Sequence, residues 1–315
     1  MRRFITRSNY LVNIFKALAI ILAGCLIILN LTGCKGHVTG FLDPKGIVAH
    51  EERQLFFDTL ALMLIVVLPV IVMSFTFVYH YRASHRIKEY KPNWSHSVFL
   101  ETLWWGIPCV IILVLATLTW KKTHELDPYK RIPGASEPPL LIQVIALPWK
   151  WLFIYPQQNI ATVNYLMIPV GQQVEYWITA DNVPMSAFFV PQLGSQIYAM
   201  AGMRTRLHLV ATEKGDYVGM NTQFNGDGFS DMQFPVHVVD AQEMPQWFEQ
   251  MKQSANQLSD AAYSQLLNPT IGDAPQMFAG VQENLFDNVI MTYMDTTGAV
   301  HPRNNQLKFS NPVHY

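Results

Sequence analysis

Two long apolar runs in the first half of the chain dominate its hydrophobic pattern. One run, residues 59–79, is uncharged, and a second apolar run, which contains the single acid Glu101, covers about residues 98–120. At 1.5 Å of rise per residue, a helix of either length crosses a hydrocarbon core of about 30 Å. The pattern predicts a hairpin of two transmembrane helices, which we place at residues 56–81 and 98–120.

The loop between these spans carries the charges that orient the hairpin. Residues 82–97 contain four basic side chains, namely Arg82, Arg86, Lys88 and Lys91. An excess of Lys and Arg is typical of the cytoplasmic side of a membrane protein. We therefore expect residues 82–97 to be cytoplasmic and the rest of the chain after the second span to lie outside.

A shorter apolar run, residues 17–29, precedes the hairpin and follows four basic residues, as in a secretory signal peptide. The string Leu31-Thr32-Gly33-Cys34 resembles a bacterial lipobox, in which a peptidase cuts before a cysteine that carries diacylglycerol. We expect residues 1–33 to be removed and lipid to be attached to Cys34, at the start of an extracytoplasmic segment 34–55. Two alternatives are a first transmembrane helix and a cut before Cys25, which would leave an apolar stub.

Beyond the second span the period of the pattern changes. Residues 121–139 are polar and contain prolines, as expected of a linker. Short β-rich runs separated by turn signals then fill residues 140–240, and many such runs predict a β-sandwich or Greek-key barrel. The expected strands are 140–146, 151–155, 162–168, 174–179, 187–190, 206–210 and 232–239.

The last segment, residues 241–315, begins with a helical pattern and ends in a polar tail. Met244, Trp247, Phe248 and Met251 recur at helical spacing. This stripe predicts packing rather than a cofactor site, so we expect a C-terminal helical extension.

Composition supports a membrane protein with an outer domain. Only 14% of the residues are charged, against roughly 25% in an average soluble protein. From Leu140 onward there are 7 basic and 14 acidic residues, while 15 basic and 9 acidic residues precede it. This asymmetry argues against nucleic-acid binding. Residues 140–315 contain no cysteine, so a thiolate metal ligand is excluded there.

Two long strings in the outer domain carry a family resemblance. The segments Gln143–Pro156, which includes Trp149-Lys150-Trp151, and Val190–Met203 resemble subunit II of haem-copper oxidases, in particular the cytochrome bo-type ubiquinol oxidases. The similarity runs from Leu42 to at least Val239. It implies a cupredoxin-like Greek-key sandwich in the periplasm and a non-catalytic subunit of a proton-pumping ubiquinol:oxygen oxidoreductase in the inner membrane of an aerobic respiratory chain. It also implies a partner, subunit I, that holds the haems and one copper.

The resemblance also indicates what the outer domain has lost. The cytochrome c oxidase branch binds two copper ions through one histidine and a C-x-x-x-C-x-x-x-H-x-x-M string, which supplies thiolates, imidazole and thioether. The corresponding positions in this chain are Met185, Asn221, Asn225, Phe229 and Met232. Four strong ligands are missing, so we expect no metal in this domain and a packing role for Met232.

Glu101 lies a turn inside the second span, where a carboxylate is costly. From the residues alone, an interfacial side chain reaching toward the headgroups explains it equally well. The string from His96 to Pro108 matches the family pattern H-x-x-x-x-E-x-x-W-x-x-x-P, whose glutamate stands at the cytoplasmic mouth of a proton pathway into subunit I. The resemblance therefore implies that Glu101 is a proton entrance.

Two other functions stay open at this stage. One is a copper-containing subunit that receives electrons in a cytochrome c oxidase, which copper analysis would reveal. The other is a lipoprotein scaffold unrelated to respiration, which would not co-purify with a haem protein.

Overall fold

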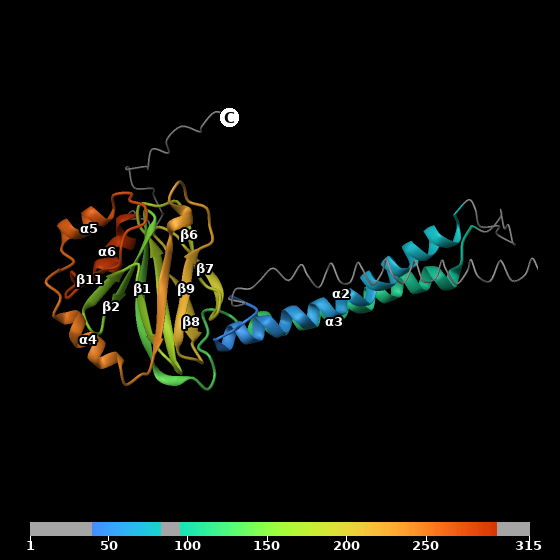
Figure 1. Cartoon of the computed structure of the whole chain (residues 1–315), viewed down its shortest axis with the longest axis horizontal. Coiled ribbons are helices and arrows are strands. Elements are labelled where there is room, and N and C mark those ends of the chain that lie inside the picture. The colour runs from blue at the N-terminus through green and yellow to red at the C-terminus, as the bar shows by residue number, and fades with distance from the viewer. Residues whose placement is uncertain (1–39, 83–94, 295–315) are drawn as a thin grey trace, which may run out of the picture. The chain divides into compact units, whose positions relative to one another are not determined.

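The computed structural model describes residues 40–82 and 95–294 (Figure 1). The expected signal segment, the lipid site at Cys34, residues 83–94 of the expected loop and residues 295–315 of the tail lie outside this description. Two helices come first, α2 (Ile47–His80) and α3 (Val98–Glu125). Both are long and apolar enough to cross a membrane. The two predicted apolar helices are thereby confirmed.

Helix α2 begins nine residues before the expected span because its first turns are polar but still helical. These turns rest on the β-domain. Gly46 forms a β-bridge with Ala211. A Cβ atom at Gly46 would lie 2.4 Å from the carbonyl oxygen of Leu193, so only glycine fits this approach. Six residues after Gly46, Oε1 of Glu52 accepts hydrogen bonds from the hydroxyl of Ser195 at 2.7 Å and from the backbone N–H of Ser195 at 3.2 Å.

The β-domain consists of two sheets, which confirms the predicted sandwich. The first has the strand order β11-β3-β2-β1-β5-β8 and the second the order β4-β10-β9-β6-β7. The strands of the first sheet are β1 (Ser136–Leu147), β2 (Lys150–Tyr155), β3 (Ile160–Val163), β5 (Gln172–Ala180), β8 (Thr205–Val210) and β11 (Gln276–Phe278). Those of the second are β4 (Leu166–Pro169), β6 (Ser186–Val190), β7 (Gly194–Ala199), β9 (Gly215–Asn221) and β10 (Gln233–Val239).

The strand pattern differs from the expectation in four places, one of which is β11, a strand inside the segment that was expected to be helical. The run at residues 162–168 forms the ends of two strands, β3 and β4, in different sheets. Asn164 divides them with φ of 51°, a left-handed conformation that asparagine adopts more readily than most residues. Strands β7 and β9 were not among the expected strands, because each begins at a glycine that reads as a turn signal.

Strands β2 and β3 of the first sheet are buried at every position, on both faces of the sheet, which explains why their sequences are mostly apolar. Alternate side chains of a strand point to opposite faces. On β2, Trp151, Phe153 and Tyr155 enter the core between the sheets, while Leu152 and Ile154 enter a second core. The C-terminal segment supplies the other side of that second core through α5 (Asp260–Leu266), β11 and α6 (Leu285–Thr292) (Figure 1).

Helix α4 (Met244–Lys252) contains the predicted apolar stripe and packs it into the first core. Met244, Trp247 and Met251 are buried there, and Phe248 is partly buried. The burial of these side chains agrees with the predicted packing role of the stripe.

Candidate functional site

The five positions aligned with copper ligands lie at one end of the second sheet and in the loop between β9 and β10. Asn221 ends β9, Met232 directly precedes β10, and Asn225 lies in the loop between these strands. Phe229 begins the short 3-10 helix η1 (Phe229–Asp231), and Met185 directly precedes β6.

Three of these residues meet in one buried cluster. The side-chain nitrogens of Asn221 and Asn225 each lie 3.4 Å from the sulfur of Met232. Nδ2 of Asn225 also donates a hydrogen bond of 3.1 Å to Oγ of Ser186. Met232 is 1% exposed and each asparagine is 4% exposed. We call Ser186, Asn221, Asn225 and Met232 the amide-thioether cluster.

The other two aligned residues are arranged differently. Phe229 packs its ring against Phe224, with 5.6 Å between the ring centroids. Met185 is partly buried and is not part of the amide-thioether cluster, although the next residue, Ser186, is.

The chemistry of the amide-thioether cluster does not fit a copper centre. It offers amides, one hydroxyl and one thioether, whereas copper of this type needs thiolates and imidazoles. The amides serve the backbone instead: Oδ1 of Asn221 accepts hydrogen bonds from the backbone nitrogens of Ala187 at 2.8 Å and Gln223 at 3.0 Å. Within residues 40–82 and 95–294, no group of three or more His, Cys, Asp or Glu side chains is placed to hold a metal ion.

Trp149 holds the loop that contains Asn225. Its φ of 58° is uncommon for a bulky residue. Nε1 of Trp149 donates a hydrogen bond of 3.2 Å to the backbone oxygen of Asn225. The ring also covers Gly228 so closely that a Cβ atom there would lie 2.5 Å from two ring carbons. The turn between β1 and β2 therefore fixes the β9–β10 loop in place.

Glu101 lies in the first turn of α3, which begins after Ser97. Its side chain is partly buried. Its carboxylate makes no hydrogen bond or ion pair with the other described residues. The neighbouring Thr102 and Leu103 line the space between α3 and α2. Nothing in the described part of this chain therefore neutralises the Glu101 carboxylate.

A buried carboxylate that the sequence analysis did not single out connects the C-terminal segment to the sandwich. Asp181 is 0% exposed. Its two oxygens accept hydrogen bonds of 2.6 Å from the hydroxyls of Tyr263 and Tyr293. The hydroxyl of Tyr293 also accepts a hydrogen bond of 2.8 Å from the backbone nitrogen of Asn182. A buried carboxylate needs hydrogen-bond donors. The position of Asp181 between two apolar strands could therefore have indicated from the sequence that donors from elsewhere in the chain bind it.

Lys150 makes a second buried connection to the same segment. It is 1% exposed. Its ammonium group lies 2.7 Å from Oδ2 of Asp273 and donates hydrogen bonds to the carbonyl oxygen of Asn268 and the hydroxyl of Thr270. Burial acts to raise the pKa of Asp273, but the hydrogen bonds from Lys150 and Thr270 and the charge of Lys150 outweigh it. The pKa of Asp273 is therefore lowered.

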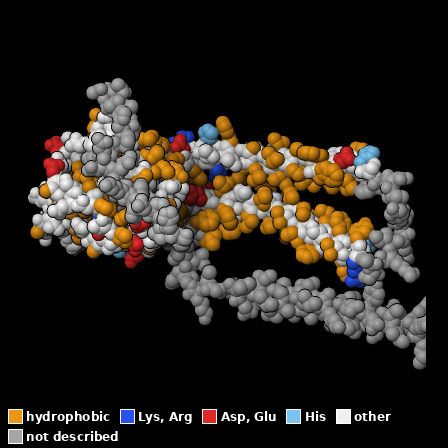
Figure 2. Space-filling view, turned by 90° about the horizontal axis from the view of Figure 1, so that it is seen from above, with side chains coloured by type: hydrophobic (Ala, Val, Ile, Leu, Met, Phe, Trp, Pro, Cys, Tyr) orange, Lys and Arg blue, Asp and Glu red, His pale blue; other side chains and the backbone are white. Residues whose placement is uncertain are grey.

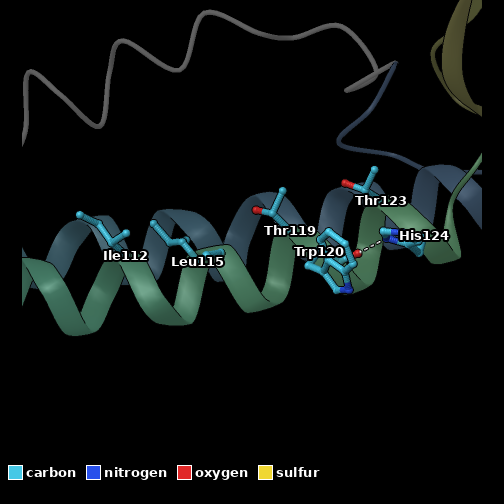
Figure 3. A pocket seen from close by; sticks show the side chains of 7 residues that line it. Ile112, Leu115, Thr119, Trp120, Thr123 and His124 are labelled. Atoms are coloured by element: carbon cyan, nitrogen blue, oxygen red, sulfur yellow. Dashed lines mark hydrogen bonds between the residues drawn. The ribbon is translucent and has the colours of Figure 1, made fainter.

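A groove of about 530 Å³ runs along the C-terminal half of α3. Figure 3 shows its lining, in which Ile112, Leu115, Thr119 and Thr123 follow one side of the helix toward His124. Nδ1 of His124 is hydrogen-bonded to the carbonyl oxygen of Trp120, 2.8 Å away. Small side chains in such a groove allow a neighbouring spanning helix to approach closely.

Comparisons with known proteins found similarities to a family model and to a solved structure. A family model described as COX Aromatic Rich Motif matches residues 252–297, the segment that contains Tyr263, Asp273 and Tyr293. The periplasmic domain of subunit II of cytochrome oxidase from Bradyrhizobium japonicum aligns with a TM-score of 0.35 and 22% identity, covering 38% of this chain and 96% of that one.

Curated relatives match over much more of the chain. Cytochrome bo(3) ubiquinol oxidase subunit 2 of Pseudomonas aeruginosa is 45% identical over 262 residues, covering 82% of this chain and 78% of the relative. Ubiquinol oxidase subunit 2 of Acetobacter aceti is also 45% identical, covering 86% of this chain and 87% of the relative. The chain therefore belongs to the family of ubiquinol oxidase subunit 2 and is a subunit of an oxidoreductase complex.

Proposed function

We propose that this chain is a non-catalytic, copper-free subunit II of a proton-pumping ubiquinol:oxygen oxidoreductase. In this proposal the haems and the active-site copper belong to subunit I, and ubiquinol is a substrate of the complex. The chain supports assembly and provides a proton entrance. The names of the relatives and the chemistry of the amide-thioether cluster support this function.

The observation that carries the proposal is the contact of Asn221 and Asn225 with the sulfur of Met232. An electron-accepting copper centre would need thiolates where these two amides stand. Electrons from a soluble cytochrome would then have no metal in this domain to reach, which favours a membrane quinol as the donor. Metal analysis of this subunit, separated from the purified complex, should find no bound copper, whereas stoichiometric copper would overturn the proposal.

Glu101 is the proposed proton entrance. Partial burial and the absence of a partner within the described residues leave its carboxylate available to exchange a proton. An acid at this depth is expected to face protein or water rather than lipid. In the complex, that protein would be subunit I. Glu101→Gln, which keeps the size but removes the exchangeable proton, tests this role through the rate of oxygen reduction.

The groove on α3 is the proposed contact with a spanning helix of subunit I. Its lining combines apolar side chains with the small residues Ala116, Thr119 and Thr123, which suits close helix packing in a membrane. Substitution of Ala116 by Phe should reduce co-purification of the haem-bearing subunit. Normal recovery of the complex would count against this contact.

The proposed location is the bacterial inner membrane, with the β-domain in the periplasm and residues 82–97 in the cytoplasm. The basic residues between the two spans support this orientation. We propose diacylglycerol attachment at Cys34 after removal of residues 1–33. Mass spectrometry of the N-terminal peptide tests it: a lipid-modified Cys34 is expected, and an unprocessed terminus would contradict it.

A further inference from the structure

A narrow apolar space separates α2 from α3. It measures about 500 Å³ and is lined by Leu62 and Ile65 of α2 and by eight residues of α3 within the stretch Phe99–Val114. Figure 2 shows hydrophobic side chains along both helices and open space between them. Its one polar lining side chain, Thr102, donates a hydrogen bond of 2.9 Å to the carbonyl oxygen of Val98. The space therefore offers only apolar contacts.

The dimensions of this space identify what can fill it. From Phe99 to Val114 the helix rises by about 22 Å, and over that length 500 Å³ corresponds to a cross-section of about 20 Å². A helix is about 10 Å wide and needs roughly 80 Å². Carbon atoms in contact lie about 4 Å apart, so one extended hydrocarbon chain needs roughly 15–20 Å². The space fits a single chain and is too narrow for another helix.

Gly106 keeps the middle of this space open. A Cβ atom at Gly106 would meet no other described atom within 4 Å. Both Gly106 and its neighbour Ile107 line the space. A larger side chain at Gly106 would thus enter the space without clashing with either helix.

A cation lies beyond one end of the space. The helices are aligned by the ion pair between Lys122 and Glu51, whose charged atoms are 2.8 Å apart. Phe99 lies 23 residues from Lys122 along α3, and the position 23 residues from Glu51 along α2 is residue 74. Tyr79 of α2 therefore lies about five residues, or roughly 7 Å, beyond the level of Phe99, where the space ends. The guanidinium of Arg82 stacks over the ring of Tyr79, 4.8 Å from its centroid. Arginine at this depth is suited to bind a lipid phosphate.

We propose that the space between α2 and α3 binds one acyl chain of a diacyl phospholipid whose phosphate is held by Arg82. The inference rests on the proposed orientation of the hairpin, which places Arg82 at the cytoplasmic leaflet. A phospholipid is favoured over a quinol because its headgroup carries the negative charge that Arg82 complements.

The test uses the purified complex in nanodiscs of phosphatidylethanolamine and phosphatidylglycerol. A trace of phosphatidylglycerol with a photoactivatable diazirine in one acyl chain serves as the probe, and labelled peptides are identified by mass spectrometry. Gly106→Leu fills the space, and Arg82→Gln removes the cation. The matched controls are Cys109→Leu, which adds bulk at an exposed position outside the space, and Lys121→Gln, which removes a charge at the other end of α3.

We expect labels within residues 99–114. Labelling should fall by about tenfold in Arg82→Gln, the loss expected for one charge-assisted hydrogen bond, and at least as far in Gly106→Leu, whose side chain would occupy the space. The two controls should label like the unchanged protein. Unchanged labelling of Gly106→Leu, displacement of the probe by ubiquinone, or cross-linking of this stretch to another subunit would each overturn the inference. Quinol oxidation is measured in parallel, so failed labelling with full turnover rejects the lipid site and leaves the proposed function standing.

Discussion

The side-chain nitrogen of Asn221 lies 3.4 Å from the sulfur of Met232, across the loop that joins β9 to β10. In the family branch that binds copper, the aligned positions are a cysteine and a methionine. In this chain an amide and a thioether make a buried hydrogen-bonded contact instead. Packing of Met232 and the hydrogen bonds that Asn221 accepts from the backbone hold the geometry of this loop.

Removal of either group should therefore destabilise the outer domain. Met232→Ala should cost about 2–5 kcal/mol, as expected for a buried side chain. Asn221→Ala should cost about 1–3 kcal/mol because the backbone N–H groups of Ala187 and Gln223 lose their acceptor. Urea-dependent proteolysis of this chain in the purified complex measures both effects. Ser230→Ala, at an exposed position of the same loop, is the control, and equal resistance of all variants would contradict the packing role.

Gly228 should tolerate no side chain. In Gly228→Ala the new Cβ atom would lie 2.5 Å from the ring of Trp149, so the loop or the ring must move. We expect a loss of about 1–3 kcal/mol, measured by the same urea series. Gly228 has a φ of −89°, so the matched control is Gly280→Ala, at a glycine that is not left-handed and whose Cβ atom would meet only Cγ of Gln257, 3.9 Å away. A Gly228→Ala variant as stable as the unchanged protein would show that the Trp149 contact is dispensable.

The two tyrosines that bind Asp181 should anchor the C-terminal segment. Tyr263→Phe and Tyr293→Phe each remove one hydrogen bond of 2.6 Å to this buried carboxylate, at a cost of about 1–3 kcal/mol. The double variant should differ from the sum, because both hydroxyls bind the same group. Hydrogen exchange of residues 252–294 reports the loosening. Tyr198→Phe, at an exposed site, should leave exchange unchanged, and unaltered protection in all variants would contradict the anchoring.

The pairing of Lys150 with Asp273 predicts a specific acid sensitivity. The pKa of Asp273 is lowered in the folded protein, so its stabilisation is complete above its ordinary value of about 4 and is lost as pH falls through the folded-state pKa below it. Asp273→Asn should be less stable than the unchanged protein at pH 7, and the difference should shrink below about pH 4. Denaturation midpoints across this range test it. A constant difference at every pH would contradict the prediction.

Glu101→Gln should slow oxygen reduction by about tenfold, which corresponds to roughly 1.4 kcal/mol in the barrier. The loss should appear in turnover and not in recovery of the complex, because the amide keeps the shape of the side chain. Glu125→Gln, at the other end of α3, is the matched control and should turn over normally. Unchanged turnover of Glu101→Gln would return this residue to an interfacial role.

The apolar runs predicted the helices, and the strings around Trp149 and Met203 predicted the family. The strands β7 and β9 escaped prediction because their first residues, Gly194 and Gly215, look like turn signals. Asp181 and Tyr263 are 82 positions apart in the sequence, and a local sequence pattern does not predict a contact between residues so far apart. The alignment with the copper-ligand string singled out Asn221, Asn225 and Met232, and the structure brings these three residues together. The fourth residue of that string, Phe229, packs against Phe224 instead.

The most direct test of the proposed function is the electron donor of the complex. Oxygen consumption by the purified complex is measured with a ubiquinol analogue and, separately, with reduced cytochrome c. We predict rapid consumption with the quinol and none above background with cytochrome c, because the proposed function gives this subunit no copper centre to receive electrons from cytochrome c. Sustained turnover with cytochrome c would contradict the account and would require an electron-accepting metal in this chain.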